Sequence, residues 1–268
     1  KAKWGWLSVS VHSSTLRAQV EIKRDPRKAG GEDEGDICRF CGEVLTDANR
    51  NKSPPHPALA DICMDDWCQE KAAIASREVL GCGHVSGGVA GDEKSKWRLP
   101  CLQGCDGVRI DGDELCTVCF TDPISMAPSI RLKCGHVFHG QCMKDVIEAR
   151  WWVKTVHISW SFLECPTCSK PIESEWKDMK ELLEPLQKLR DDHRRRALQR
   201  VRLEGLDKDD EVAKPTGRFH GDLEGYAMHS LVFFECHKCH RPYYGGRRAC
   251  GVAGVGEVKK EELICSAC

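Results

Sequence analysis

The apolar positions of residues 176–203 follow a helical period. They recur at three- and four-residue steps, and this spacing predicts an amphipathic helix. Pro185 is expected to kink this helix or to divide it into two, and Gly205 marks its expected end. The apolar positions are Trp176, Met179, Leu182, Leu183, Leu186, Leu189, Ala197 and Val201.

Residues 6–14 instead alternate between apolar and polar side chains, reading WLSVSVHSS. Such alternation predicts a β-strand, and the polar run at 23–36 predicts a linker. We therefore interpret residues 1–36 as the tail of a preceding domain and a linker, in a chain that begins at Lys1 and is expected to be a fragment. No signal peptide and no apolar run of about 18 residues is present, so no membrane partner is expected.

The composition changes this picture because 18 of the 268 residues are cysteine. Disulfides are the rival explanation, but repeated C-x-x-C spacing beside histidines is a metal pattern. Several small zinc-stabilised α+β modules are therefore expected in place of one large core, in a reducing compartment that is intracellular and cytoplasmic. The net charge of −1 does not indicate nucleic-acid binding, so no nucleic-acid partner is expected. The basic run His193–Arg200 is interpreted as a solvated helix face.

The middle of the chain, residues 113–172, carries eight ligands in the order C-x2-C-x14-C-x-H-x2-H-x2-C-x22-C-x2-C. Zinc takes four sulfur or nitrogen ligands at tetrahedral corners, so eight ligands suit two ions. This order predicts a RING finger of the RING-H2 type with an interleaved, cross-braced pairing. One ion takes Cys116, Cys119, His139 and Cys142, and the other takes Cys134, His136, Cys165 and Cys168.

RING fingers recruit a ubiquitin-conjugating enzyme (E2) through an apolar surface. The matching positions here are Val118, Val146, Trp151 and Pro166, although at least one of Trp151 and Trp152 is expected in the core. Many RING ligases place an arginine after the last ligand, where this chain has Ser169 and Lys170. Lysine lacks the planar fork of arginine, so weak activation of direct transfer to lysine is expected.

Two further ligand groups flank the RING. In the upstream module, 37–110, the simplest assignment pairs Cys38, Cys41, Cys63 and Cys68 on one ion, and Cys82, His84, Cys101 and Cys105 on another. An interleaved pairing stays open. Downstream, Cys236, Cys239, Cys265 and Cys268 complete one more site, with His237 and His240 as competing ligands. About five zinc ions in closed, structural sites are therefore expected.

This assignment leaves one cysteine, Cys250, without a site. Arg247 and Arg248 precede it, and neighbouring cations lower a thiol pKa and favour the nucleophilic thiolate. The glycines around it predict a mobile loop. Such a loop could carry the sulfur to the thioester that joins ubiquitin to an E2 bound at the RING. Two alternatives stay open: Cys250 replaces a neighbouring cysteine on zinc, or it is an inert loop thiol.

The stretch from Cys38 to Cys268 resembles the Pam/Highwire family of RING-Cys-relay ubiquitin ligases. The motifs that carry the resemblance are CGHVSGGV at 82–89, LPCLQGCD at 99–106, CTVCFTDPISMAPSI at 116–130, EARWW at 148–152, GYAM at 225–228, YYGGRRAC at 243–250 and EELICSAC at 261–268.

The resemblance implies a relay of ubiquitin from the E2 to Cys250, then to a second cysteine, and finally to a threonine or serine hydroxyl. It also implies an acidic residue near the ester-forming site, Glu262, and a helical spacer at 173–206. A tandem-cysteine domain would begin within 219–268, with the second relay cysteine and a histidine base beyond Cys268. Protein substrates and an F-box partner are further implications, together with a possible nuclear or axonal location.

Three functional hypotheses follow. The first is the relay ligase, with Cys250 as the ubiquitin acceptor. The second is an ordinary RING ligase that scaffolds direct transfer from the E2 to lysine. The third is a non-enzymatic, zinc-stabilised interaction module.

Overall fold

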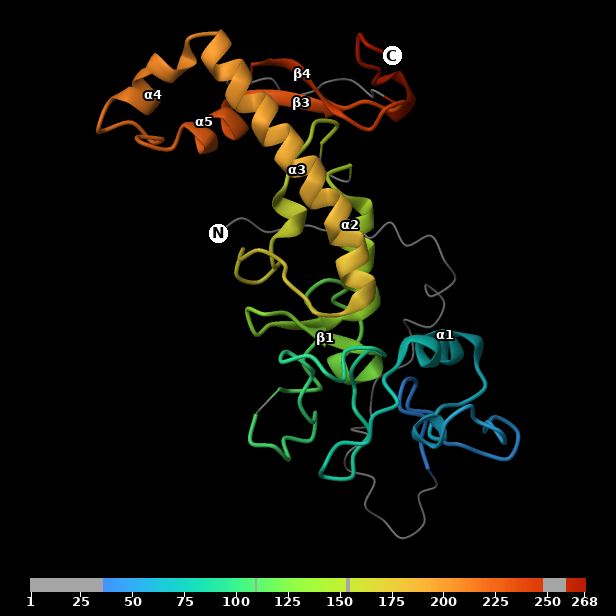
Figure 1. The fold of residues 1–268 in the computed structure, drawn as a ribbon. Coiled ribbons are helices and arrows are strands. Elements are labelled where there is room, and N and C mark those ends of the chain that lie inside the picture. The colour runs from blue at the N-terminus through green and yellow to red at the C-terminus, as the bar shows by residue number, and fades with distance from the viewer. Residues whose placement is uncertain (1–35, 109, 153–154, 248–258) are drawn as a thin grey trace. The chain divides into compact units, whose positions relative to one another are not determined.

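The computed structural model describes residues 36–108, 110–152, 155–247 and 259–268 (Figure 1). The strand expected at 6–14 and the relay candidate Cys250 lie outside these ranges. Contacts divide the chain into two units, Lys1–Cys142 and Met143–Cys268. The longer described elements are α1 (Asp66–Ile74), β1 (Ser129–Arg131), β2 (Val137–His139), α2 (Gly140–Ala149), α3 (Lys177–Leu203), α4 (Asp210–Ala213), α5 (Leu223–Ser230), β3 (Leu231–Glu235) and β4 (Pro242–Arg247).

The first unit begins with a small core built around cysteine side chains. Helix α1 starts at Asp65, whose carboxylate accepts a hydrogen bond from the backbone N–H of Trp67, 3.1 Å away. The apolar side chains Phe40, Leu45, Leu59 and Ile62 pack with Cys38, Cys63 and Cys68 in one buried cluster. We call residues 36–75 the zinc module from here on.

The β1–β2 hairpin follows in the same unit. Its strands are antiparallel, with Ile130 opposite Phe138, and both of these side chains are buried. Residues 87–88 extend this small sheet, because the backbone N–H of Ser129 donates to the carbonyl of Gly87 at 2.9 Å. The segment upstream of the RING ligands is therefore bonded to the hairpin that carries them.

The second unit is organised by helix α3. Figure 1 shows it as one continuous helix, so Pro185 does not divide it. The proline lies on the exposed side, where the carbonyl of Glu181 that loses its helical bond can turn to solvent. Helix α3 packs against α5 and strand β4, and Gly205 caps its end with φ of 67°.

The buried stripe of α3 includes a residue that the sequence did not indicate. Met179, Leu183, Leu186, Ala197 and Val201 are buried as expected, and His193 is buried with them. The interpretation of His193–Arg200 as a solvated face is therefore wrong for His193. This residue lies four positions before Ala197 in the same apolar stripe and faces the core.

A shared backbone feature closes four of the C-x-x-C turns. The residue after the second cysteine donates its N–H to the carbonyl of the first cysteine at 2.8–2.9 Å, and it adopts a left-handed conformation. These residues are Gly42, Phe120, Ser169 and His240, with φ of 72°, 53°, 56° and 54°. Only the first is glycine, the residue that this conformation favours.

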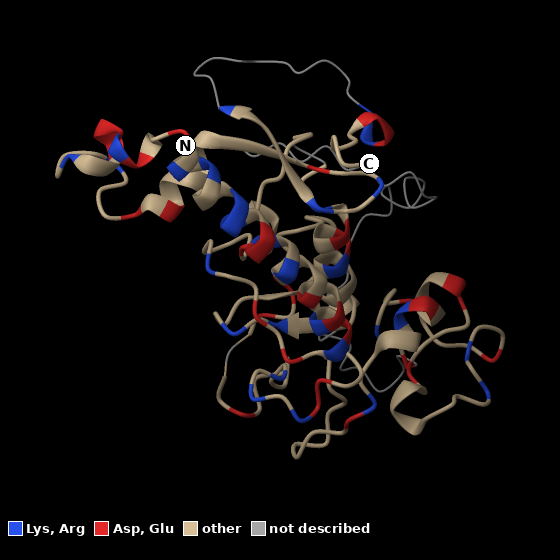
Figure 2. Ribbon diagram, turned by 45° about the horizontal axis from the view of Figure 1, so that its top comes forward, with Lys and Arg blue, Asp and Glu red and all other residues tan. Residues whose placement is uncertain are grey.

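Short strands, mostly short helices and Cys/His clusters confirm the expected class of small zinc-stabilised α+β modules. Basic and acidic residues are interspersed along the described ribbon, as Figure 2 shows. In the part of the chain that the structure describes, no helix has the length and apolar character needed to cross a membrane.

Candidate metal centres

Five groups of four Cys or His residues come together within the described residues. In each group the four candidate ligand atoms lie within 4.8 Å of one another. The groups are Cys38/Cys41/Cys63/Cys68, Cys82/His84/Cys101/Cys105, Cys116/Cys119/His139/Cys142, Cys134/His136/Cys165/Cys168 and Cys236/Cys239/Cys265/Cys268.

The distances inside these groups fit zinc. Ligands at tetrahedral corners with Zn–S bonds of about 2.3 Å place two sulfurs about 3.8 Å apart, and a sulfur and a nitrogen about 3.5 Å apart. The Sγ–Sγ distances are 3.8 Å for Cys38–Cys68, 3.7 Å for Cys41–Cys63 and 3.8 Å for Cys239–Cys265. The cysteines that the structure describes are free thiols, so disulfides are not the explanation. Five quartets confirm the expectation of about five zinc ions.

The histidine-containing groups fit equally well. In the first RING site, His139 Nδ1 lies 3.7 Å from the sulfurs of both Cys119 and Cys142. Its other ring nitrogen, Nε2, is 2.9 Å from the carbonyl oxygen of Pro123. An Nε2–H that donates to this carbonyl leaves Nδ1 unprotonated and turned towards the sulfurs, as a metal-binding histidine requires.

The structure brings the upstream ligands together in the simpler of the two pairings left open by the sequence. In the downstream group it brings four cysteines together and neither competing histidine. His240 turns its Nδ1 towards the carboxylate of Glu235, 3.3 Å away. His237 is exposed.

The quartets differ in burial. In the Cys38 group three of the four ligands are buried, whereas in the Cys82 group only Cys101 is buried. In the Cys38 group, the hydrogen bond between the Cys38 and Cys68 sulfurs lowers the pKa of Cys38 to about 4. Zinc binds cysteine as the thiolate, so metal binding releases thiol protons from the group.

The residues proposed for E2 contact do not all lie at the surface. Pro166 is exposed, and Val118 and Val146 are half-buried. Trp151 is only 2% exposed, so its assignment as a contact residue is wrong. Its ring packs against Trp160 and Phe162, with centroids 5.7 and 5.9 Å away, and these contacts require a core position.

Phe120 is a surface residue that sequence reasoning missed. It follows Cys119 directly, is 58% exposed, and has the left-handed backbone of a turn-closing residue. Exposed aromatic side chains are a common feature of protein-binding surfaces. Its position directly after the first C-x-x-C pair of the RING, two residues from Val118, was the available signal.

The proposed catalytic residues are placed only in part. Cys250 lies outside the described residues, and β4 ends at Arg247, shortly before it in the sequence. Glu262 is exposed at the end of a short 3-10 helix, Lys260–Glu262. The five quartets contain every cysteine of the chain except Cys250, and each has four ligands without it.

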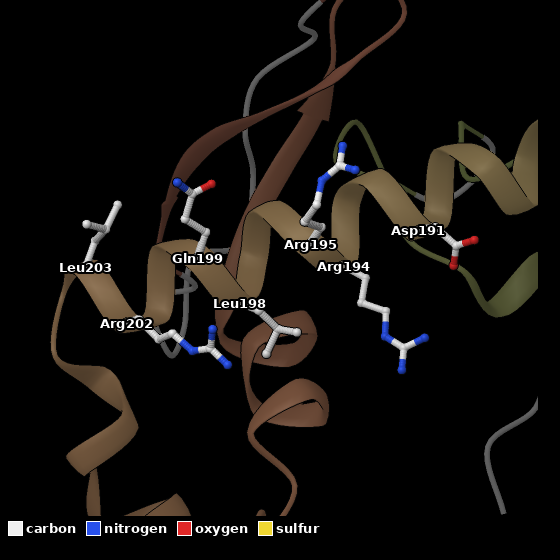
Figure 3. A pocket seen from close by; sticks show the side chains of 7 residues that line it. All are labelled: Asp191, Arg194, Arg195, Leu198, Gln199, Arg202 and Leu203. Carbon is white, nitrogen blue, oxygen red and sulfur yellow. The ribbon is translucent and has the colours of Figure 1, made fainter.

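A pocket of about 660 Å³ lies away from these cysteines. Figure 3 shows that its lining side chains all come from helix α3. It contains neither cysteine nor histidine, and two of its arginines are paired, Arg194 with Glu224 and Arg195 with Asp192. The pocket supplies no metal ligand.

The paired quartets at 116–168 define a RING-type zinc protein. The same residues match the family described as zinc finger, C3HC4 type (RING finger). The whole chain is 36% identical over 274 residues to the E3 ubiquitin-protein ligase MYCBP2 of Danio rerio. It is 35% identical over 285 residues to the E3 ubiquitin-protein ligase highwire of Drosophila melanogaster.

Both alignments cover 100% of this chain, which spans only 6% and 5% of the lengths of these two relatives. The resemblance to the Pam/Highwire family drawn from its motifs is thereby confirmed.

Proposed function

We propose that this chain forms the RING-containing, ubiquitin-transferring part of an E3 ubiquitin ligase. The RING ligand set and the names of the two relatives support this proposal. An E2 that carries ubiquitin as a thioester would contact the positions predicted from the RING pattern, of which Pro166 is exposed and Val118 and Val146 are half-buried. The exposed Phe120, two residues after Val118, is a further candidate. Fully closed four-ligand zinc sites suit a structural role, because they leave no open position for chemistry.

The finer proposal is that Cys250 accepts the ubiquitin. Its thiolate attacks the carbonyl carbon of the E2–ubiquitin thioester, a new C–S bond forms, and the E2 cysteine leaves as a thiolate that takes up a proton. The two thioesters are similar in free energy, so the rate depends on how well the sulfur is positioned. The observation that carries this proposal is that five complete quartets account for every other cysteine of the chain.

Transfer would end on a hydroxyl of a threonine or serine substrate after a second cysteine has taken the ubiquitin. Glu262, exposed near the downstream quartet, is the acidic residue proposed to lie near that step. An F-box partner and a cytoplasmic location belong to the same proposal and rest on the family alone.

The test is a non-reducing gel of the chain mixed with ubiquitin-charged E2. A ubiquitin adduct that disappears on reduction and in Cys250→Ser supports the relay. Cys105→Ser is a useful comparison, because it removes a thiol from an exposed zinc site and should leave an adduct on Cys250. An adduct that persists in Cys250→Ser contradicts the assignment.

Direct transfer from the E2 to lysine is the second candidate, favoured by the completeness of the two RING quartets without Cys250. A discharge assay that offers free lysine and free threonine separates the two candidates. If Cys250→Ser discharges the E2 to lysine as fast as the unmodified chain does, the ordinary RING mechanism is correct. The position after the last ligand, where Ser169 and Lys170 stand, favours the relay.

A further inference from the structure

An ion pair joins the end of helix α2 to the end of strand β3. Arg150 Nη1 lies 3.1 and 2.9 Å from the two carboxylate oxygens of Glu235. The Glu235 side chain is only 8% exposed and that of Arg150 is 33% exposed. Removing one partner of such a pair leaves the other charge poorly solvated. Both side chains are therefore needed for the pair to be stable.

The backbone of Arg150 is an independent sign that this side chain is required. Arg150 directly follows α2 with φ of 54°, a position where helices commonly place glycine. A non-glycine residue held there has a strained backbone. The guanidinium also lies 5.8 Å from the centre of the Trp151 ring, which holds it against the core.

The two ends of the ion pair belong to the two parts that the relay must align. Helix α2 carries Val146, part of the proposed E2 contact. Glu235 directly precedes the zinc ligand Cys236 and is paired with Pro242 at the start of β4. Strand β4 runs to Arg247, and Cys250 follows shortly after in the sequence.

Two further contacts run parallel to this ion pair. The backbone N–H of Ile158 donates to the carbonyl of Phe233 in β3 at 2.8 Å. The indole N–H of Trp160 donates to His193 Nδ1 at 3.0 Å, and the His193 ring lies 4.7 Å from that of Phe233. These contacts can hold the segment after α2 against the β3–β4 hairpin when the ion pair is removed. Loss of the ion pair should therefore displace the hairpin slightly and leave it packed against this segment.

We propose that Arg150 and Glu235 are positioning residues for ubiquitin transfer, which hold the hairpin leading to Cys250 at a fixed place relative to the E2-docking helix. This inference rests on the proposed relay. A displacement of about 1 Å costs a positioned reaction on the order of 100-fold in rate, so loss of the pair should slow transfer far more than it weakens E2 binding.

The test is a single-turnover assay on the 268-residue chain with ubiquitin-charged E2. Arg150→Gln should slow formation of the reducible Cys250 adduct by about 10- to 100-fold, while the E2 dissociation constant stays within about twofold. The double variant with Arg150→Gly and Glu235→Gln removes both charges and relieves the left-handed strain. It should fold as stably as the unmodified chain and still transfer slowly.

Lys188→Ala is the matched control, because it breaks an exposed i,i+4 pair with Glu184 on α3 and should change neither quantity. Transfer at the unmodified rate in the folded double variant would overturn the positioning role. A fall in E2 affinity equal to the fall in rate would also overturn it, since the pair would then act only through docking. An unmodified chain that forms no adduct refutes the relay itself, a different and recognisable failure.

Discussion

The zinc module and the region around helix α3 are stabilised in different ways. In the zinc module the metal ligands are themselves the centre of the core, with Phe40, Leu59 and Ile62 packed around them. Helix α3 supplies no metal ligand among the described quartets, and it buries an apolar stripe against α5 and β4. The first core therefore depends on an ion and the second on packing between long-range partners, which is how a chain of small modules can also contain a 27-residue helix.

Removing zinc with a chelator should separate the two regions most clearly. Structural zinc contributes on the order of 10 kcal/mol to small modules, so the backbone N–H groups of residues 38–75 should lose their protection from hydrogen exchange. Amides in the middle of α3 should stay protected under the same conditions. Simultaneous loss of protection in both regions would show that α3 depends on metal as well.

A matched pair of core truncations provides the next largest contrast. Leu59→Ala in the zinc module and Leu186→Ala in α3 each remove a side chain that is almost fully buried, and each should cost about 2–5 kcal/mol in urea unfolding. Raising the free zinc concentration should restore the stability of the Leu59 variant, because the ion binds the folded module. An equal gain for the Leu186 variant would contradict the distinction.

Acid should weaken the α3 region through His193. Burial lowers the pKa of this histidine from 6.5 to about 4, although Asp192 opposes the shift. The unfolded chain takes up the proton below pH 6.5, while the folded chain excludes it until about pH 4, so stability falls as the pH drops through this window. Between pH 7 and pH 5 the loss should be about 2 kcal/mol.

The variant His193→Leu isolates this effect from acid release of zinc, which acts on both proteins. The difference in urea midpoint between the variant and the unmodified chain should change between pH 7 and pH 5 in favour of the variant. A difference that does not depend on pH would mean that His193 is already charged in the folded chain.

The smallest expected effect concerns Lys71 of α1. Its ammonium donates to the carbonyl of Met126 at 2.7 Å, lies 3.7 Å from Asp122, and stands 3.2 Å from the centre of the Trp67 ring. Desolvation lowers its pKa despite these partners. Lys71→Met should cost about 1–2 kcal/mol, measured by urea unfolding, since it leaves the Met126 carbonyl without this donor. A stabilised variant would show that the burial penalty exceeds these contacts.

The zinc quartets could be predicted because their ligands occur as pairs close together in the sequence, such as Cys116 with Cys119. A pair on one turn fixes two corners of a tetrahedron, and few partners remain for the other two. Helix α3 was predictable for a similar reason, since its period is local. Its predicted stripe lacked a residue between Leu189 and Ala197, and the structure fills that place with His193.

Contacts between residues that are distant in the sequence left no local pattern from which they could be predicted. Arg150 and Glu235 are 85 positions apart, and nothing near either residue marks the other as its partner. Trp151 was misassigned because a tryptophan after a RING helix has the same sequence appearance whether it faces an E2 or the core. Only the placement of Trp160 and Phe162 against its ring decides between the two.

The left-handed residues that close the C-x-x-C turns have a consequence for the protein without its metal. Phe120, Ser169 and His240 keep a backbone that side chains disfavour because sulfurs on either side of each turn are tied to one ion. When the ion leaves, each of these residues relaxes towards an extended backbone, and the direction of its side chain changes. Zinc depletion would therefore turn the Phe120 ring away from its surface position, and the E2 docking proposed above would then depend on zinc supply.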